Sequence, residues 1–244
     1  MDTKSAARTL DLFEAFANAR RPMTLTELAR QLDSPMSSCF QLIKTLERRG
    51  YVFSLGARRG TYPTKRMLYA FEKIAQHDPL KMIFQDMLIE LQARTLETAI
   101  LAQQVDQRML ILDAQESSQK VRYTPDIGEF HDLHSTAAGK AILGAMDPEE
   151  RHQFIETLAL EKLTDITVID REALETELER SAARGWYVTR GENIPDLCAV
   201  AVPVRVKGQV FAVGLGGPFH RFITEIDRHA ETLMEVVSQL DGAE

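Results

Sequence analysis

The 244-residue sequence predicts two domains, a mainly helical one at the N-terminus and an α+β one with an antiparallel sheet at the C-terminus. Three observations predict this. Three helical patterns and a β-hairpin pattern fill the N-terminal part, strand and helix patterns alternate in the C-terminal part, and charge divides the same way. Residues 1–75 hold 13 basic and 7 acidic residues, whereas residues 76–244 hold 16 and 29. We therefore place the boundary between residues 75 and 76, with a basic domain that suits a polyanion.

A composition of 44% hydrophobic and 27% charged residues is that of an ordinary folded protein and excludes a disordered or fibrous chain. No run approaches the roughly 20 apolar residues that a membrane span needs. The first ten residues have no apolar signal core, so we expect a cytoplasmic protein. Cys39 and Cys198 lie far apart and form no metal or redox motif, which predicts reduced, buried thiols.

The N-terminal domain begins with three helical patterns. Residues 5–19 carry an apolar stripe with helical spacing. Thr24 and Glu27 have the spacing of a capping box at the start of a second helix. Ser34 is predicted to cap a third helix, with Pro35 as its first residue. Because only a tight three-residue turn separates the second helix from the third, the pattern predicts a helix-turn-helix.

The next stretch, "YVFSLGARRGTYPT", predicts a β-hairpin with a Gly- and Arg-rich turn, which would be the wing of a winged helix-turn-helix. The third helix exposes polar side chains that suit the major groove, where Gln reads adenine and Lys reads guanine, while wing arginines suit phosphate or a narrow minor groove. The alternative is a winged helix that contacts another protein, with these residues merely solvated. The predicted DNA-binding residues are Ser37, Ser38, Gln41, Lys44, Arg48, Arg58 and Arg59.

A linker helix over residues 64–76 follows, and "HDP" separates it from another helix. The second of these helices has one apolar face, which belongs either to the core or to a subunit interface. That face consists of Leu80, Ile83, Phe84, Met87, Leu88 and Leu91.

The rest of the C-terminal part predicts strands and helices in mixed order. A strand pair over residues 97–117 turns at Asp106-Gln107, and a tight Lys207-Gly208 turn joins the last two strands. The other predicted elements are helices over 147–159, 170–185 and 223–240 and strands over 186–192, 197–206 and 209–217. This order is typical of an α+β domain with an antiparallel sheet.

The stretch "HSTAAGKAIL" at residues 134–143 suggests two kinds of site, a phosphate loop and a zinc site, and the sequence supports neither fully. A phosphate loop needs Gly at the position of His134 and Ser or Thr at that of Ala141, so that reading fails. His131 and His134 have a spacing that can hold zinc, but no third ligand stands nearby. We expect a structural or hydrogen-bonding role for these histidines, and no metal or other cofactor.

The same stretch also predicts a helix start capped by Ser135 or Thr136, followed by small residues. Two interpretations stay open. Backbone N–H groups at this start could bind an anion with the help of the helix dipole, or the small residues could only allow close packing on the sheet.

A fusion of a DNA-binding domain to an enzyme or metal-dependent catalytic domain is the alternative function. Catalysis would need a nucleophile with its base or a metal centre. Cys198 lies in an apolar strand pattern without a companion base, and His131 and His134 lack a third partner, while a catalytic histidine or Glu192 in this domain stays open. We therefore expect a regulator and not an enzyme.

Both halves together resemble the IclR family of bacterial transcriptional regulators over essentially the full chain. The resemblance is carried by "LTELARQLDSPMSSCFQLIKTLERRGYV", "GEFHDLHSTAAGKAIL", "GWYVTRGE" and "AVPVRVKGQVFAVGLGGP". It implies a winged helix-turn-helix joined to a GAF-like effector-binding domain, in a homodimer or homotetramer that binds a near-palindromic DNA operator. It also implies a small organic acid as effector. Gln41 stands where an arginine is usual, which implies a different operator sequence.

The resemblance further implies an effector pocket in which two backbone N–H groups meet a ligand carboxylate. Members that bind very small acids have an acidic residue, a cysteine and two serines at four other pocket positions, whereas this chain has Thr, Ala, Gly and Gly. These replacements imply a roomier, less polar pocket for an aromatic or longer-chain acid. The implied effector-binding residues are Ala137, Ala138, Thr189, Ala199, Gly214 and Gly216.

Overall fold

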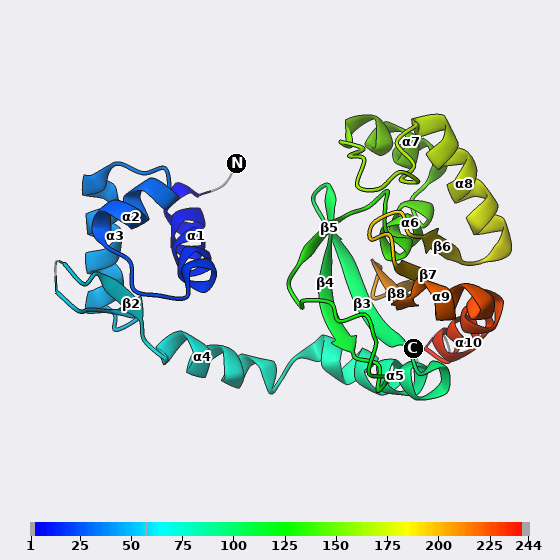
Figure 1. The fold of residues 1–244 in the computed structure, drawn as a ribbon, viewed down its shortest axis with the longest axis horizontal. Helices are drawn as coiled ribbons and strands as arrows, with labels where there is room; N and C mark the ends of the chain where they lie inside the picture. The colour runs from blue at the N-terminus through cyan, green and yellow to red at the C-terminus, as the bar shows by residue number, and fades with distance from the viewer. Residues whose placement is uncertain (1–2, 57, 241–244) are drawn as a thin grey trace. The chain divides into compact units, whose positions relative to one another are not determined.

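The computed structural model describes residues 3–56 and 58–240. It divides into two compact units, Met1–Asp78 and Pro79–Glu244, so the division falls a few residues after the predicted boundary. Figure 1 shows the two units along the chain, and each is described by itself. No helix in the described ranges has the length and apolar character needed to cross a membrane.

The first unit contains the predicted helices and hairpin. Thr24 and Glu27 form the capping box: the N–H of Glu27 donates to the Thr24 hydroxyl (3.3 Å), and the N–H of Thr24 donates to the Glu27 carboxylate (2.8 Å). The elements of this unit are α1 (Lys4–Ala19), α2 (Leu25–Gln31), α3 (Met36–Arg48), β1 (Val52–Ser54), β2 (Thr61–Pro63) and α4 (Arg66–Ala75).

The predicted start of the third helix is wrong by one residue. Pro35 is extended (ψ 139°) and stands at the cap position, so α3 begins at Met36. Ser34 does not cap it, because the turn goes through Asp33 in the left-handed region (φ 41°) and the Ser34 N–H closes back onto the Ala29 carbonyl (2.9 Å). The Ser34 hydroxyl is left buried without a hydrogen bond among the described residues.

The predicted wing hairpin is confirmed. Its strands β1 and β2 pair antiparallel, and the isolated bridge between Met23 and Thr61 ties it to the loop before α2. Gly60 has φ +81°, and a Cβ there would lie 2.3 Å from the Met23 carbonyl oxygen. Only glycine therefore allows this close approach of the wing to the helical body.

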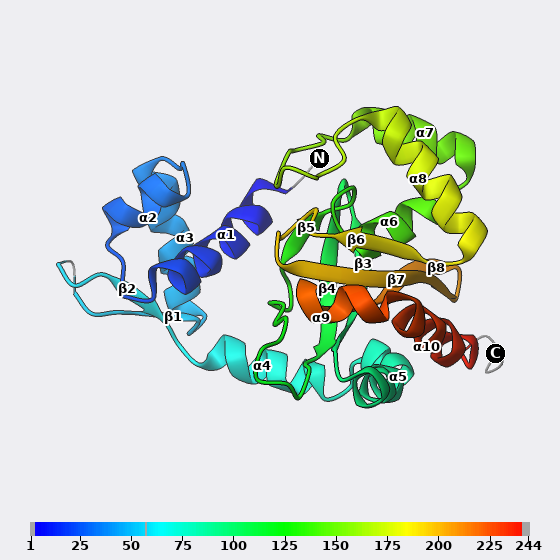
Figure 2. The same ribbon diagram turned by 45° about the vertical axis from the view of Figure 1, so that its right-hand side comes forward.

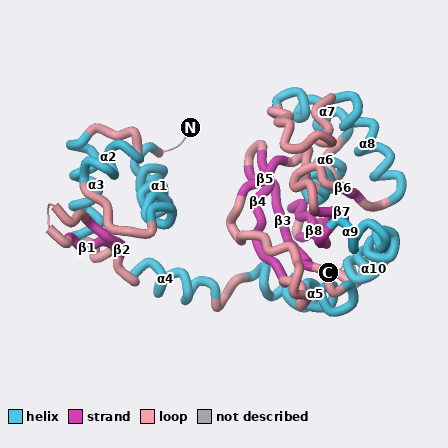
Figure 3. Tube along the Cα trace, in the orientation of Figure 1, coloured by secondary structure: helices cyan, strands magenta, loops and turns pink. Residues whose placement is uncertain are grey.

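The second unit is built on a six-stranded sheet in the order β5-β4-β3-β8-β7-β6, antiparallel throughout (Figure 3). Its strands are β3 (Thr98–Val105), β4 (Arg108–Gln115), β5 (Phe130–Asp132), β6 (Tyr187–Arg190), β7 (Leu197–Val206) and β8 (Gln209–Pro218). The two predicted tight turns are confirmed, with positive φ at Asp106, Lys207 and Gly208. The short edge strand β5 was not predicted.

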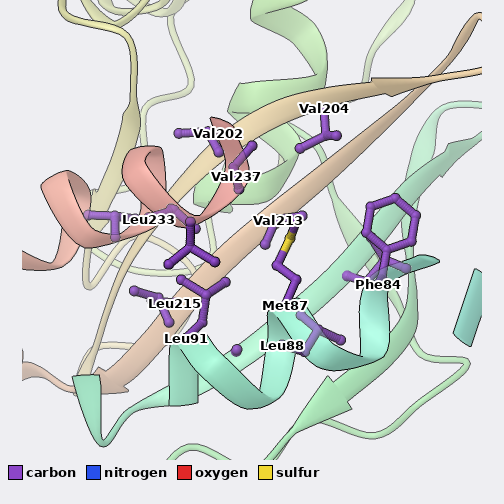
Figure 4. Packing of buried hydrophobic residues seen from close by; sticks show 14 of the residues in the cluster. Phe84, Met87, Leu88, Leu91, Val202, Val204, Val213, Leu215, Leu233 and Val237 are labelled. Atoms are coloured by element: carbon purple, nitrogen blue, oxygen red, sulfur yellow. The ribbon is translucent and has the colours of Figure 1, made fainter. Parts of the chain in front are cut away.

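Helices cover both faces of this sheet, as Figures 1 and 2 show. One face carries α5 (Pro79–Thr95), α9 (Phe219–Phe222), a 3₁₀ turn (Ile223–Glu225) and α10 (Ile226–Ser238); the other carries α6 (Ala137–Gly144), α7 (Pro148–Thr157) and α8 (Arg171–Arg184). In the first layer, Phe84, Met87, Leu88 and Leu91 of α5 pack against strand valines and α10 (Figure 4). The apolar face predicted for α5 therefore belongs to the core of this unit.

Candidate functional site

A cavity lies where the start of α6 meets the sheet. It is lined by residues from β3, β4, the β4–β5 loop, β5, the start of α6, β6, the β6–β7 loop, β7 and β8. The six residues implied to bind an effector come together here: Ala137, Ala138, Thr189, Ala199, Gly214 and Gly216 all line it. The cavity is narrow, and little of it would admit a water molecule.

The start of α6 is capped by Thr136, one of the two residues predicted for this position. The Thr136 hydroxyl accepts from the N–H of Gly139 (3.1 Å) and donates to the Asp132 carbonyl (3.0 Å). Neither the Ala137 nor the Ala138 N–H has a hydrogen-bond partner among the described residues. Helix starts leave such N–H groups unpaired and positive, and these two belong to residues that line the cavity.

Gly139 supports the second interpretation of this stretch, in which small residues allow close packing. A Cβ on it would lie 2.3 Å from the Leu133 carbonyl oxygen, so α6 could not approach the preceding segment with a larger residue. The small residues thus do two things: Gly139 allows close packing, while Ala137 and Ala138 border the cavity.

The cavity is mostly apolar. Its polar side chains are Tyr123, His131, Thr136, Thr189 and Asn193, and none of the described residues that line it is Lys or Arg. An anion at the α6 end would therefore meet backbone amides and the helix dipole instead of a cationic side chain.

Lys140, the lysine of the Gly-Lys pair, is fully buried behind α6. Its Nζ lies 2.7 Å from Oε1 of Glu177 on α8 and 2.5 Å from Oε2 of Glu192 in the β6–β7 loop. Burial raises the pKa of the Glu192 carboxyl, and the charge of Lys140 opposes that rise. The cluster joins α6 to the loop that carries Asn193, which lines the cavity. Lys140 is therefore paired with two carboxylates within the protein.

The two histidines of "HDLH", His131 and His134, lie in different surroundings. His131 lines the cavity, whereas a ring nitrogen of His134, Nε2, lies 3.0 Å from the Glu161 carbonyl oxygen. Burial lowers the pKa of His134. The described residues contain no group of three His, Cys, Asp or Glu side chains placed to hold a metal ion. Both cysteines are buried free thiols, as predicted, and burial raises the pKa of Cys198 to about 11.

The predicted DNA-reading residues of α3 share its exposed face. Ser37, Ser38, Gln41, Lys44 and Arg48 are exposed, while the opposite face of the helix is buried in the first unit. Arg58 and Arg59 are exposed in the wing turn. Lys44 is already paired, since its Nζ lies 2.8 Å from Glu47 of the same helix.

Residues of α1 also border this surface, and sequence reasoning did not single them out. Ser5, Ala6, Arg8 and Thr9 of α1 line an open groove beside α3, together with the predicted residues Ser37, Ser38 and Gln41. The apolar stripe of α1 gave no sign that its other face lies next to the recognition helix.

Comparison with known proteins follows the same division. Residues 5–54 match the IclR helix-turn-helix domain, and residues 72–242 match the bacterial transcriptional regulator IclR C-terminal domain. An HTH-type transcriptional regulator of Mycobacterium tuberculosis is 29% identical over 99% of this chain and 94% of its own. The transcriptional repressor IclR of Escherichia coli K12 is 26% identical over 89% of this chain and 81% of its own.

Two solved structures share the fold. An IclR transcriptional regulator from Alicyclobacillus acidocaldarius has a TM-score of 0.83 at 20% identity and covers 99% of both chains. An IclR homologue from Microbacterium hydrocarbonoxydans, complexed with 4-hydroxybenzoate, has a TM-score of 0.79 at 20% identity and covers 97% of both chains. With the family matches spanning the helix-turn-helix and the whole second unit, this chain belongs to the IclR family of bacterial transcriptional regulators and has a DNA-binding N-terminal domain and an effector-binding C-terminal domain.

Proposed function

We propose that this regulator changes its affinity for a DNA operator when a small organic acid with an aromatic or extended apolar body occupies the cavity beside α6. The observation that carries the proposal is the mixed lining of the cavity: the N–H groups of Ala137 and Ala138, which have no partner among the described residues, border a cavity whose walls are mostly apolar. A carboxylate suits the first and an apolar body the second. The complex of the Microbacterium homologue with 4-hydroxybenzoate supports an acid of this class.

The glycine at position 216 bears on the shape of the ligand. A Cβ there would lie 3.1 Å from Cδ1 of Tyr123, so the ring of Tyr123 takes the space that a larger residue would fill. The small size of Gly216 thus makes room for the ring of Tyr123, which becomes part of this wall, and it widens the cavity less. Because the cavity is narrow, a ligand ring needs a wall side chain to rotate, a common adjustment on binding.

For DNA binding, we propose that α3 lies in the major groove. Gln41 and Lys44 would contact base edges, with Ser37, Ser38 and Arg48 on phosphate or bases, and Arg58 and Arg59 would contact the backbone or minor groove. The exposure of all seven residues supports this arrangement. Arg8 is a further candidate for a phosphate contact, because it borders the same groove.

A homodimer is the proposed assembly, and α4 supports it. None of the α4 residues is buried, and Leu68, Phe71 and Ile74 are 55%, 57% and 66% exposed. Met67, Leu68, Phe71 and Ile74 fall on one helical face by their spacing. A second copy of the chain would cover this face and would match the two-fold symmetry of a near-palindromic operator.

Isothermal titration calorimetry with the full-length protein tests the effector class. We expect benzoate or 4-hydroxybenzoate to bind at least about tenfold more tightly than pyruvate or glyoxylate, since only the aromatic acids bury ring surface. Methyl benzoate is the matched ligand without a charge and should bind more weakly than benzoate. Tighter binding of pyruvate, or equal binding of the ester, would contradict the proposed effector class.

A further inference from the structure

His131 lines the cavity with a polar atom that nothing in the described structure satisfies. The residue sits in β5 opposite Met109 of β4, and both side chains line the cavity. Only 13% of its side-chain surface is exposed, and its Nε2 is buried without a hydrogen-bond partner among the described residues. The nearest charged atom, Oε2 of Glu129, lies 3.4 Å away without hydrogen-bond geometry. A buried polar atom left unpaired costs free energy, which a bound ligand group would recover.

His131 differs in chemistry from the α6 end of the cavity. The amides of Ala137 and Ala138 can only donate hydrogen bonds and suit a carboxylate, whereas a neutral imidazole nitrogen donates or accepts according to its tautomer. A hydroxyl group can be either the donor or the acceptor, so it complements both tautomers. The group that fits His131 is therefore a hydroxyl, which can stand elsewhere on the same ligand as the carboxylate.

Tyr123 supplies a flat, neutral wall of the same cavity. Its carbonyl oxygen accepts from the Thr98 hydroxyl (2.6 Å), which anchors its loop to the sheet, and its ring packs over Gly216. Burial, followed by the charges of Glu129 and Asp126, raises the pKa of Tyr123 to about 12. A neutral aromatic wall favours an aromatic ligand through offset stacking.

From this geometry we propose that His131 is a specificity-determining residue, and that the effector is an aromatic carboxylic acid that also carries a ring hydroxyl bonded to Nε2 of His131. The inference rests on the proposed function and narrows it from aromatic or extended acids to hydroxylated aromatic ones. Tyr123 then contributes equally to all aromatic acids, whereas His131 distinguishes hydroxylated from unsubstituted ones.

The test is calorimetry with benzoate, 3-hydroxybenzoate and 4-hydroxybenzoate against full-length wild-type, His131→Leu, His131→Asn and Tyr123→Leu proteins. In the wild type, one hydroxybenzoate should bind about tenfold more tightly than benzoate, the size of one well-formed hydrogen bond. His131→Leu should abolish this preference and leave benzoate affinity within about threefold. His131→Asn, which keeps hydrogen-bonding capacity, should retain part of it. Tyr123→Leu should weaken all three acids while the preference persists.

The outcomes separate this inference from the proposed function. If benzoate binds but neither hydroxybenzoate binds more tightly, or if the preference survives in His131→Leu, the role of His131 is wrong while the aromatic-acid effector stands. If none of the three acids binds the wild type, the aromatic part of the proposed effector class fails, and the inference fails with it. His152→Leu, which alters an exposed histidine outside the cavity, should leave all three affinities unchanged.

Discussion

At the scale of single residues, Lys140 is expected to contribute strongly to stability. Its buried Nζ holds Glu177 and Glu192, so Lys140→Met leaves two carboxylates without their counter-charge. Removing one partner of a buried ion pair costs about 3–5 kcal/mol, and we expect about 3 kcal/mol because Glu177 is partly exposed. The free energy of unfolding in urea measures it.

Two variants control that measurement. Lys162→Met removes an exposed lysine that pairs with Asp165, and it should change the free energy of unfolding by less than about 1 kcal/mol. Lys140→Met combined with Glu192→Gln should recover part of the loss, since one buried charge disappears with its partner. A Lys140→Met protein as stable as the Lys162→Met protein would show that the cluster contributes little.

The sequence could predict some of the cavity residues and not others. The stretch of small residues after a capping Thr136 predicted a helix start whose amides could meet a ligand, and Ala137 and Ala138 do border the cavity. Tyr123 and Asn193 gave no signal, because they lie in loops whose path depends on tertiary packing. His131 was noticed only as half of a metal motif. Its neighbours in the cavity follow from its place in β5. This strand has only three residues, too few for the alternation of side chains to be recognised in the sequence.

At the scale of elements, α4 has an apolar face that nothing covers within the described chain. Phe71→Glu places a charge in the middle of that face, and in a homodimer it would bury an unpaired carboxylate. We expect the dimer dissociation constant to rise at least about thirtyfold, as for a hot-spot residue. Sedimentation equilibrium measures it. Lys73→Glu introduces the same residue on the opposite face of α4 and should leave the dimer intact; equal behaviour of the two variants would contradict a role for α4.

Most elements followed from sequence patterns that are long enough to repeat. The α5 stripe and the turns at Asp106 and Gly208 are where periodicity and turn chemistry put them. The exceptions have physical reasons. Three residues of β5 and four of α9 hold barely one period of a strand or helix. The start of α3 shifted because Pro35 is extended, and local propensity alone allows proline on either side of a helix boundary.

At the scale of the whole molecule, the proposed effector cavity lies in the second unit and the proposed DNA-reading face lies in the first. The proposed coupling must be reciprocal: an acid that lowers operator affinity must lose affinity by the same factor when DNA is bound. Such couplings amount to about 5- to 150-fold.

Ala137→Pro offers a clean way to disable the acid site. Ala137 is the first residue of α6, where proline is tolerated, and Thr136 before it is already extended (φ −116°, ψ 145°). The substitution removes one N–H and places ring atoms in the proposed carboxylate position while the helix is kept. DNA binding without acid should therefore match that of the wild type.

The most direct test of the central claim is fluorescence anisotropy of wild-type and Ala137→Pro proteins against labelled DNA from upstream of the coding region, with a scrambled duplex as control. Benzoate and the hydroxybenzoates are titrated at several salt concentrations. We predict selective binding that weakens as salt rises, and a shift of at least about fivefold by an acid in the wild type that disappears in Ala137→Pro. Selective DNA binding that no acid shifts, or a shift that survives unchanged in Ala137→Pro, would contradict it.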